Sequence, residues 1–218
     1  ISNLYVVVLF KKEIFDYNKK LPLFGINDSF YKTFPDRPNL LTKKEVRVQI
    51  LADLELPENG VIWDIGAGCG SIGLECLRLR PKLKLISVDK RFGTEKIILE
   101  NAKRLGVSPS LILEKNINEL IGIEVNRSLQ LPDRVIIGGC KLEQKLFIIK
   151  KFSELMKKGD IFVLPIVTLE VLQKIQSLFN ELNFQSNLKV IHIEKGVTIA
   201  EGTRFEPSNP IFILKGKI

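Results

Sequence analysis

The sequence is poor in the residues that bind metals and form cross-links. It contains only three cysteines, Cys69, Cys76 and Cys140, and a single histidine, His192, among 218 residues. The cysteines have neither the short spacing of a zinc site nor the even number of a disulfide framework. One histidine also disfavours a Ser-His-Asp triad. We therefore expect no bound metal, and we expect reduced thiols in a cytoplasmic protein.

Long apolar runs are absent as well. The longest, Leu4–Phe10, is far shorter than the roughly eighteen residues of a membrane-spanning helix, so no membrane partner is expected. Hydrophobic residues nevertheless make up 45% of the chain, which is enough to bury the core of one medium-sized domain.

Residues 1–24 are expected to be the tail of a preceding domain followed by a linker. Leu4–Phe10 is rich in β-branched residues and predicts a strand, with no start signal before it. Lysines and prolines then follow irregularly up to about residue 41. We expect a single domain over residues 25–218.

Strands and helices alternate from residue 42 onward, a pattern typical of a parallel sheet with right-handed crossovers. Thr42 and Glu45 match a capping box, which predicts a helix from there to about Leu54. The sequence further predicts helices over 71–79, 94–105, 142–156 and 169–182, and strands over 61–65, 84–88, 110–114, 133–137, 160–165, 187–194 and 210–215. The last two strands flank the polar segment 196–209 and are expected to pair antiparallel.

The most informative stretch is residues 61–73, a predicted strand that leads into four glycines. The first three glycines allow a sharp turn and a close approach of a ligand to the backbone. The fourth, Gly73, allows the following helix to pack against the strand. Asp89, at the end of the next strand, suits the two hydroxyl groups of a ribose. The pattern therefore indicates a nucleoside-binding site.

Two kinds of nucleoside fit this pattern. Residues 68–73 match the G-x-G-x-x-G of dinucleotide-binding folds, in which a pyrophosphate lies at a helix N-terminus. Asp64, just before the turn, would repel a pyrophosphate, whereas it would attract the ammonium and sulfonium groups of S-adenosylmethionine. S-adenosylmethionine is therefore favoured, and a dinucleotide or a turn that binds nothing remain alternatives.

The net charge of +8 calls for an anionic partner or a well-solvated surface. The basic residues are spread along the chain, and no basic run is interleaved with aromatic residues as in proteins that bind single-stranded nucleic acid. A small polycarboxylate is also compatible with this charge. We therefore expect a small-molecule substrate and no nucleic acid.

Several segments resemble the decarboxylating precorrin methyltransferases of vitamin B12 synthesis. They are Gly25-Ile-Asn-Asp28, Leu41-Thr-Lys-Lys-Glu-Val-Arg47, Trp63-Asp-Ile-Gly-Ala-Gly-Cys-Gly-Ser71, Asp133-Arg-Val-Ile-Ile-Gly-Gly139, Val167-Thr-Leu-Glu170 and Asn209-Pro-Ile211. The resemblance covers residues 25–215. It implies an α/β fold of the class I S-adenosylmethionine-dependent methyltransferases, with a seven-stranded, mostly parallel sheet, an antiparallel terminal strand and helices on both faces.

Enzymes of this family methylate the C15 bridge of a corrin precursor and remove the acetate carboxyl of ring C. The resemblance implies this activity, a tetrapyrrole (precorrin) substrate, S-adenosylmethionine as cofactor and a homo-oligomeric, tetrameric assembly. Residues 2–10 further resemble the last strand of a C5-methylating domain that precedes this one in fused enzymes.

The site residues follow from the resemblance and from the edge at which such sheets bind ligands. The expected cofactor residues are Asp64, Gly66, Ala67, Gly68, Gly70, Ser71, Asp89, Lys90, Asn116 and Gly138. The expected substrate residues are Thr42, Lys43, Arg47, Gly139, Lys141, Thr168 and Arg204. Asn116 stands where relatives carry an acidic residue, and its amide oxygen is expected to accept a hydrogen bond from the adenine amino group.

Glu75 and Glu170 are the candidates for an acid that assists decarboxylation, although a glutamate on a helix is more often structural. Arg47 has the alternative of pairing with the adjacent helix. Two further functions stay open at this point. One is a methyltransferase of the same fold that acts on RNA or protein, and the other is a non-catalytic binding module that uses its positive surface.

Overall fold

The computed structural model of the chain describes residues 21–123 and 129–218, so the strand expected over Leu4–Phe10 lies outside the described residues. The strands are β1 (Gly60–Ile65), β2 (Leu83–Val88), β3 (Leu111–Leu113), β4 (Arg134–Ile137), β5 (Ile161–Ile166), β6 (Gln185–Ile191), β7 (Glu194–Ile199), β8 (Gly202–Pro207) and β9 (Ile211–Lys217). The helices are the short 3-10 helix η2 (Asp28–Phe30), then α1 (Lys44–Asp53), α2 (Ser71–Leu79), α3 (Thr94–Leu105), α4 (Ile117–Ile123), α5 (Leu142–Ser153) and α6 (Leu169–Glu181).

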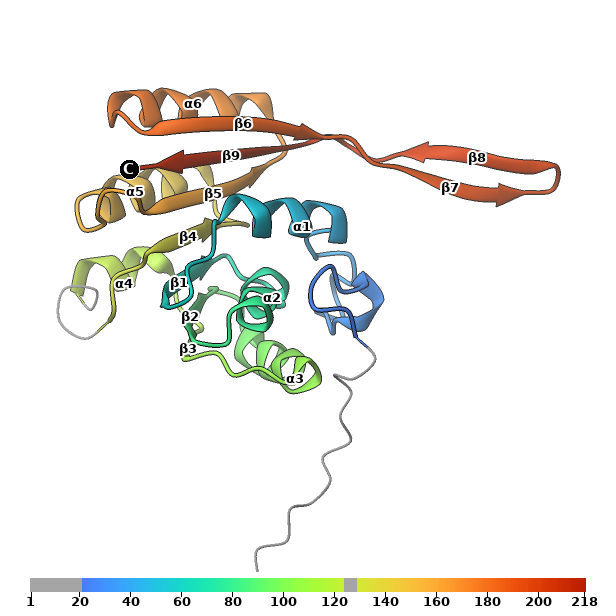
Figure 1. Ribbon diagram of the computed structural model, residues 1–218, viewed down its shortest axis with the longest axis horizontal. Helices are drawn as coiled ribbons and strands as arrows, with labels where there is room; N and C mark the ends of the chain where they lie inside the picture. Colours follow the sequence, from blue (N-terminus) through green and yellow to red (C-terminus); the bar gives the residue numbers. More distant parts are fainter. Residues whose placement is uncertain (1–20, 124–128) are drawn as a thin grey trace, which may run out of the picture.

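Seven strands form one sheet in the order β3-β2-β1-β4-β5-β9-β6 (Figure 1). The neighbours among β1 to β5 are parallel, because a helix returns the chain to the same end of the sheet between successive strands. β9 is antiparallel to both β5 and β6. The expected mostly parallel sheet with an antiparallel terminal strand is therefore confirmed.

Helices cover both faces of the sheet. On one face, α1, α2 and α3 pack over strand residues such as Ile62, Leu85 and Ile136. On the other face, α4, α5 and α6 pack over Trp63 and Phe162. Side chains of successive strand residues point to opposite faces, so Ile62 and Trp63 belong to different halves of the core. Both halves are closed to solvent.

The beginning of α1 differs from the sequence prediction. The N-cap is Lys43 rather than Thr42, and no side chain caps the helix, so the expected capping box is wrong. The carbonyl of Thr42 accepts a hydrogen bond from the buried guanidinium of Arg47 instead. The guanidinium of Arg47, itself held by Glu75 of α2, therefore fixes the entry to this helix where the local pattern predicted a side-chain cap.

The helix α4 and the strands β7 and β8 were not predicted. The short helix α4 connects β3 to β4, and its seven residues are too few to show a helical periodicity in the sequence. Residues 194–207, where a polar connecting segment was expected from 196 to 209, form the antiparallel pair β7 and β8. This two-stranded arm extends beyond the sheet at one end of the molecule (Figure 1).

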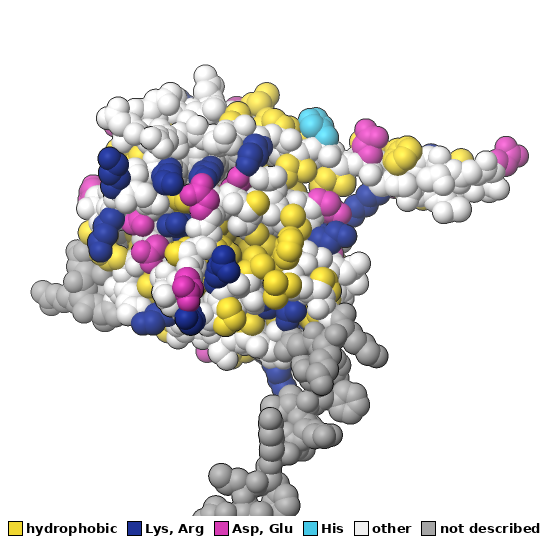
Figure 2. All heavy atoms as spheres, viewed as in Figure 1, with side chains coloured by type: hydrophobic (Ala, Val, Ile, Leu, Met, Phe, Trp, Pro, Cys, Tyr) yellow, Lys and Arg dark blue, Asp and Glu magenta, His cyan; other side chains and the backbone are white. Residues whose placement is uncertain are grey.

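None of the helices in the described ranges is long and apolar enough to cross a membrane. On the face shown in Figure 2, lysine and arginine side chains lie among acidic ones and do not merge into one continuous positive surface. This distribution agrees with the spread of basic residues along the sequence.

Candidate active site

The order of the strands reverses between β1 and β4, and the carboxyl ends of such strands border the crevice where α/β sheets bind ligands. Gly66, in the turn after β1, lies directly against the turn after β4. A Cβ atom on Gly66 would lie 2.6 Å from the backbone nitrogen of Gly139. Gly138 donates a hydrogen bond to the carbonyl of Ile65 at 2.7 Å. A side chain at position 66 would therefore prevent this close approach of the two turns.

The turn from Gly66 to Gly70 leads into α2, as the sequence predicts. The backbone nitrogens of Gly66 and Ala67 both donate to the carbonyl of Val88, which ties the turn to the end of β2. Gly70 is the N-cap of α2 in a left-handed conformation, with φ of 77°, and Ser71 begins the helix as a buried residue.

Asp64 lies behind this turn and is almost completely buried. Its Oδ2 accepts a hydrogen bond from the backbone nitrogen of Gly73 at 3.1 Å. A Cβ on Gly73 would lie 3.0 Å from the same oxygen and closer still to Leu85, so glycine is required for this approach of α2 to the sheet. Burial raises the pKa of Asp64 to about 7. A neighbouring cation would favour its charged form.

Asp89 lies at the end of β2 and is half-buried. Its two oxygens accept hydrogen bonds from the backbone nitrogens of Gly68 and Arg91, each at 2.9 Å. The carboxylate is thereby held beside the glycine turn, with lone pairs left for a ligand. A cavity next to it is lined by residues from the ends of four neighbouring strands, including Lys90, Asn116 and Gly139.

Lys145 was missed by the sequence analysis. This lysine on α5 is buried, and its Nζ donates to the carbonyls of Ile137 and Gly138 under the turn after β4. Burial lowers the pKa of Lys145 to about 8. Its spacing from Ile148 and Phe152 places it on the apolar face of α5. A lysine on an apolar helix face is unusual, so this pattern could have identified Lys145 from the sequence.

Asn116 and Gln144 form the end of the same cavity. Gln144 Nε2 donates to Asn116 Oδ1 at 3.0 Å, and the backbone nitrogen of Asn118 donates to the same oxygen at 3.2 Å. The amide oxygen that was expected to receive the adenine amino group therefore already accepts two hydrogen bonds within the protein.

Arg47 and Glu75 form a buried ion pair at the centre of a larger network. Glu75 accepts hydrogen bonds from Arg47 Nε at 2.9 Å, from the Tyr31 hydroxyl at 2.7 Å and from the backbone nitrogen of Gly25 at 2.6 Å. Both charged side chains are fully buried. Burial and the Glu75 charge raise the pKa of Tyr31 far above its usual range.

The remaining donors of Arg47 are also used. Nη1 donates to Asp28 and to the carbonyl of Thr42, and Nη2 donates to the carbonyl of Ile26. Of the two roles expected for Arg47, the structure thus shows pairing with the adjacent helix. Its guanidinium is not free to bind a substrate. Glu75 likewise has no exposed carboxyl to act as an acid. The network holds residues 25–42 against α1 and α2.

Four of the expected substrate and catalytic residues do lie exposed at helix starts. Lys43 and Lys141 are the N-caps of α1 and α5, and Thr168 is the N-cap of α6, followed by Glu170 in its first turn. Arg204 is different, because it lies on the arm strand β8 and pairs there with Glu206. The arm leaves the sheet at the carboxyl end of β6, which runs in the same direction as β5, and Arg204 lies on this projection, outside the residues that line the cavity beside Asp89.

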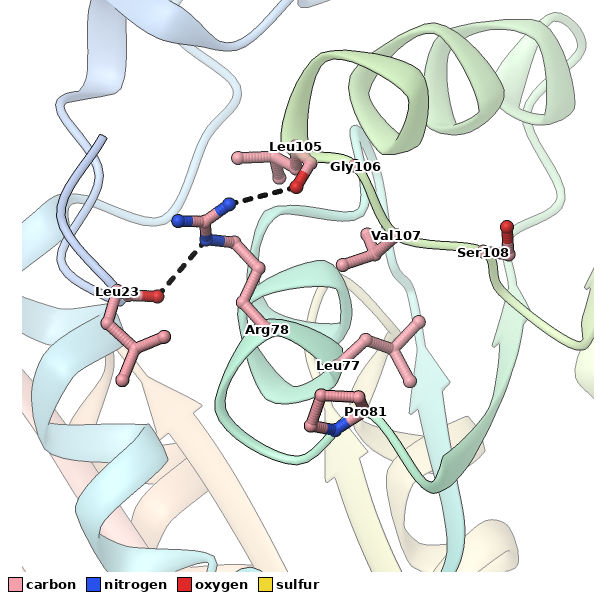
Figure 3. A pocket seen from close by; sticks show the side chains of 8 residues that line it. All are labelled: Leu23, Leu77, Arg78, Pro81, Leu105, Gly106, Val107 and Ser108. Carbon is pink, nitrogen blue, oxygen red and sulfur yellow. Dashed lines mark hydrogen bonds between the residues drawn. The ribbon is translucent and has the colours of Figure 1, made fainter. Parts of the chain in front are cut away.

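A second hollow, of about 340 Å³, lies between the ends of α2 and α3 (Figure 3). Its polar centre is Arg78, which donates to the carbonyls of Leu23 and Leu105. These bonds fasten Leu23 to α2 and α3, so we interpret the hollow as structural. In residues 21–123 and 129–218, no group of three or more His, Cys, Asp or Glu side chains is arranged to hold a metal ion.

Comparison with known proteins identifies related chains over almost the whole length. A family described as "Precorrin methyltransferase domain" matches residues 34–216. The chain is 29% identical over 205 residues to a probable cobalt-precorrin-6B C(15)-methyltransferase (decarboxylating) of Saccharolobus solfataricus, covering 93% of this chain and 98% of that protein. It is 32% identical over 193 residues to a protein of the same description from Pyrobaculum calidifontis, covering 87% and 94%.

Among solved structures, precorrin-6y C5,15-methyltransferase from Geobacter metallireducens matches with a TM-score of 0.78. The sequence identity is 28%, and the match covers 91% of this chain and 100% of that one. Sequence and fold therefore agree on the same group of proteins.

We expect Arg47→Ala to destabilise the protein by about 3–5 kcal/mol, because it leaves the buried Glu75 carboxylate without its cation. Urea denaturation would measure the loss in free energy of unfolding. Arg204→Ala removes the same kind of side chain from an exposed site and is expected to change stability by less than about 0.5 kcal/mol. A loss of similar size in both variants would contradict the assigned role of Arg47.

Proposed function

The chain belongs to the precorrin methyltransferase family, and on this premise we propose that it methylates C15 of a precorrin with S-adenosylmethionine and removes the acetate carboxyl of ring C. The observation that carries the proposal is the placement of two carboxylates, Asp64 and Asp89, on either side of the glycine turn. The first would serve a cationic group and the second would serve a ribose.

The residues at the turn fit S-adenosylmethionine better than a dinucleotide. A pyrophosphate at the start of α2 would lie near the buried Asp64 carboxylate, where charge repulsion in a medium of low polarity is strong. The ammonium group of S-adenosylmethionine would instead be attracted to it. Bound here, the cofactor supplies a methyl group already activated by its positive sulfur. The task of the chain is then to position the two reactants.

The surroundings of the cavity support a flat, polyanionic substrate. A Cβ on Gly139 would meet no atom within 4 Å, so there is open space beside this backbone. Val167 and Leu169, next to the start of α6, are exposed by 67% and 64%. Lys43 and Lys141 are exposed at the starts of two other helices and suit carboxylate side chains of a tetrapyrrole.

For decarboxylation, the bond between the acetate methylene and its carboxyl carbon breaks and carbon dioxide leaves. The bonding electron pair passes into the conjugated ring, which then takes up a proton. We propose Glu170 as the donor of that proton, because it is exposed in the first turn of α6 while Glu75 is enclosed.

We also propose that the chain assembles as a tetramer through its arm. A two-stranded hairpin alone is only marginally stable in water. The arm residues Ile199 and Phe205 are nevertheless exposed by 47% and 67%. On the edge strand β6, Leu188 and Val190 are exposed as well. Contacts with other copies of the chain would cover these apolar side chains.

The proposed reaction is tested by product analysis with a precorrin substrate and S-adenosylmethionine. We expect a product that has gained one methyl group and lost one carbon dioxide, both detected by mass spectrometry. Glu170→Gln is expected to retain the methyl gain and slow the loss of carbon dioxide by about 10²-fold, the lower range for general acid catalysis. Failure of the unaltered chain to methylate any precorrin would refute the proposal.

Cofactor binding should depend on pH through Asp64. Its raised pKa of about 7 means that binding an ammonium below pH 7 must first remove a proton from Asp64. We therefore expect calorimetry to show affinity for S-adenosylhomocysteine about fivefold weaker at pH 6 than at pH 7. Asp64→Asn should bind more weakly and lose this dependence. An equal pH dependence in both proteins would exclude Asp64 as its source.

The assembly is tested by replacing residues 194–207 with a short turn. We expect sedimentation to show a smaller assembly than for the full chain, since the arm's apolar contacts are removed. Circular dichroism should show an unchanged helical signal, because the arm pairs only with itself in the described structure. If the shortened protein assembles with the same number of chains as the full protein, the arm is ruled out as the assembly contact.

A further inference from the structure

A buried lysine supports the turn that follows β4. Lys145 belongs to α5, and 6% of its surface is exposed. Gly139 and Cys140 of the turn line the cavity beside Asp89, whereas Lys145 lies outside the lining residues. A charged side chain is costly to bury, so the contacts of its ammonium group should show what the protein gains from it.

The ammonium group of Lys145 binds the turn at two carbonyl oxygens. Its Nζ donates to the carbonyl of Ile137 at 3.2 Å and to the carbonyl of Gly138. The pairing of β4 ends at Ile136 on the side of β5 and at Ile137 on the side of β1. Both carbonyls therefore lie where the regular hydrogen bonding of the sheet stops. A charged donor from α5 takes over at this point, and charged donors form stronger hydrogen bonds than neutral ones.

The same turn is held by β1 and by the glycine turn. The backbone nitrogen of Gly138 donates to the carbonyl of Ile65 at 2.7 Å. The backbone nitrogen of Gly139 lies so close to Gly66 that a Cβ there would collide with it. A shift of the Gly138 carbonyl would therefore displace the backbone against which the glycine turn packs. Lys145 is thus connected to the proposed cofactor site through backbone atoms.

The charge of Lys145 can be lost not far above neutral pH. Burial lowers its pKa to about 8, and the nearby Cys140 thiol acts in the opposite direction. The pKa of Cys140 is itself raised by burial, so this thiol stays neutral while Lys145 titrates. Below pH 8 the ammonium form therefore dominates, and a neutral amine with weaker hydrogen bonds replaces it as the pH rises.

Other charged groups leave this titration to Lys145. Asp64, Asp89 and Lys90, from the ends of β1 and β2, act on the pKa of Cys140 and not on that of Lys145. Within the described ranges, the charged side chains of the neighbouring helices α4 and α6 are exposed to solvent; they are Glu119, Glu170, Lys174 and Glu181. Those at the start of α5, Lys141 and Glu143, are exposed as well.

We propose that the Lys145 ammonium is a positioning group, which holds residues 137–140 in the conformation that the glycine turn needs to bind the cofactor. The inference rests on the proposed use of S-adenosylmethionine and adds a residue that lies outside the cavity. It also implies an alkaline limit. Affinity for the cofactor falls as the pH rises and Lys145 loses its proton, because the turn then loses its charged support.

The test is calorimetry with S-adenosyl-L-homocysteine on the unaltered chain and on Lys145→Met, at pH 7 and at pH 9.5. Methionine removes the charge and fills the buried position with an unbranched side chain. We expect the variant to bind about tenfold more weakly at pH 7 and within about threefold of the unaltered chain at pH 9.5. The ligand's own ammonium and Asp64 titrate in both proteins, so their effects cancel in this ratio.

The pH dependence of this ratio separates positioning from a purely structural role. A structural role would lower the thermal midpoint of unfolding and leave the affinity ratio equal at the two pH values. An equal ratio would therefore overturn the inference while leaving the proposed function intact. If the unaltered chain does not bind the ligand, the proposed function and this inference are both refuted.

Lys150→Met is the matched control, because it makes the same change at an exposed position of the same helix. It should bind like the unaltered chain at both pH values. A loss in this control equal to that in Lys145→Met would overturn the inference, since net charge would then explain both. Circular dichroism checks folding. If Lys145→Met does not fold, Lys145→Gln, which keeps two uncharged N–H donors, takes its place with the same expected convergence of affinities at pH 9.5.

Discussion

The close contact between the turns after β1 and β4 is the constraint on which the site depends. Gly66 lies against Gly139 so tightly that a single Cβ would displace the backbone. This contact sets the depth of the crevice at the point where the strand order reverses. Asp64 lies behind the turn, Asp89 lies beside it, and Lys145 holds the carbonyls of the facing turn. Each polar group is thus placed relative to one rigid backbone junction.

The network around Arg47 and Glu75 closes the other side of this region. Two opposite charges without exposure to water are costly to bury unless every donor and acceptor is used, and here the guanidinium has four acceptors. The result is that residues 25–42, which have little regular structure, become a fixed part of the domain. Cation–π contacts add to this, since Arg91 lies over the Phe34 ring and Arg104 lies over the Phe30 ring.

The roles of charged residues divide according to their burial. Arg47 lies in a family motif and Glu75 was a candidate acid, yet both are enclosed and structural. Lys43, Lys141 and Glu170 remain exposed for a ligand. The net charge of +8 is therefore a poor guide to which cations bind substrate. Position relative to the carboxyl ends of the strands is more informative.

The sequence by itself determined the succession of the main strands and helices along the chain, the glycine turn and the two carboxylates beside it. These features are local, because strand and helix periodicities and glycine turns are encoded by neighbouring residues. Several helices, such as α2 and α3, match the predicted bounds. The motifs in the sequence also indicated the family to which the chain belongs.

Only the tertiary structure decided the features that depend on contacts between residues far apart in the sequence. It made Arg47 a structural cation through acceptors 19 to 28 residues away in the sequence. It also joined Asn116 to Gln144, which are 28 residues apart, through a hydrogen bond that Asn116 Oδ1 accepts. The arm strands β7 and β8 form from residues whose polarity is typical of a loop. A hydrogen bond between distant residues leaves no periodic pattern in the sequence, so its geometry emerges only when the sheet brings the two segments together.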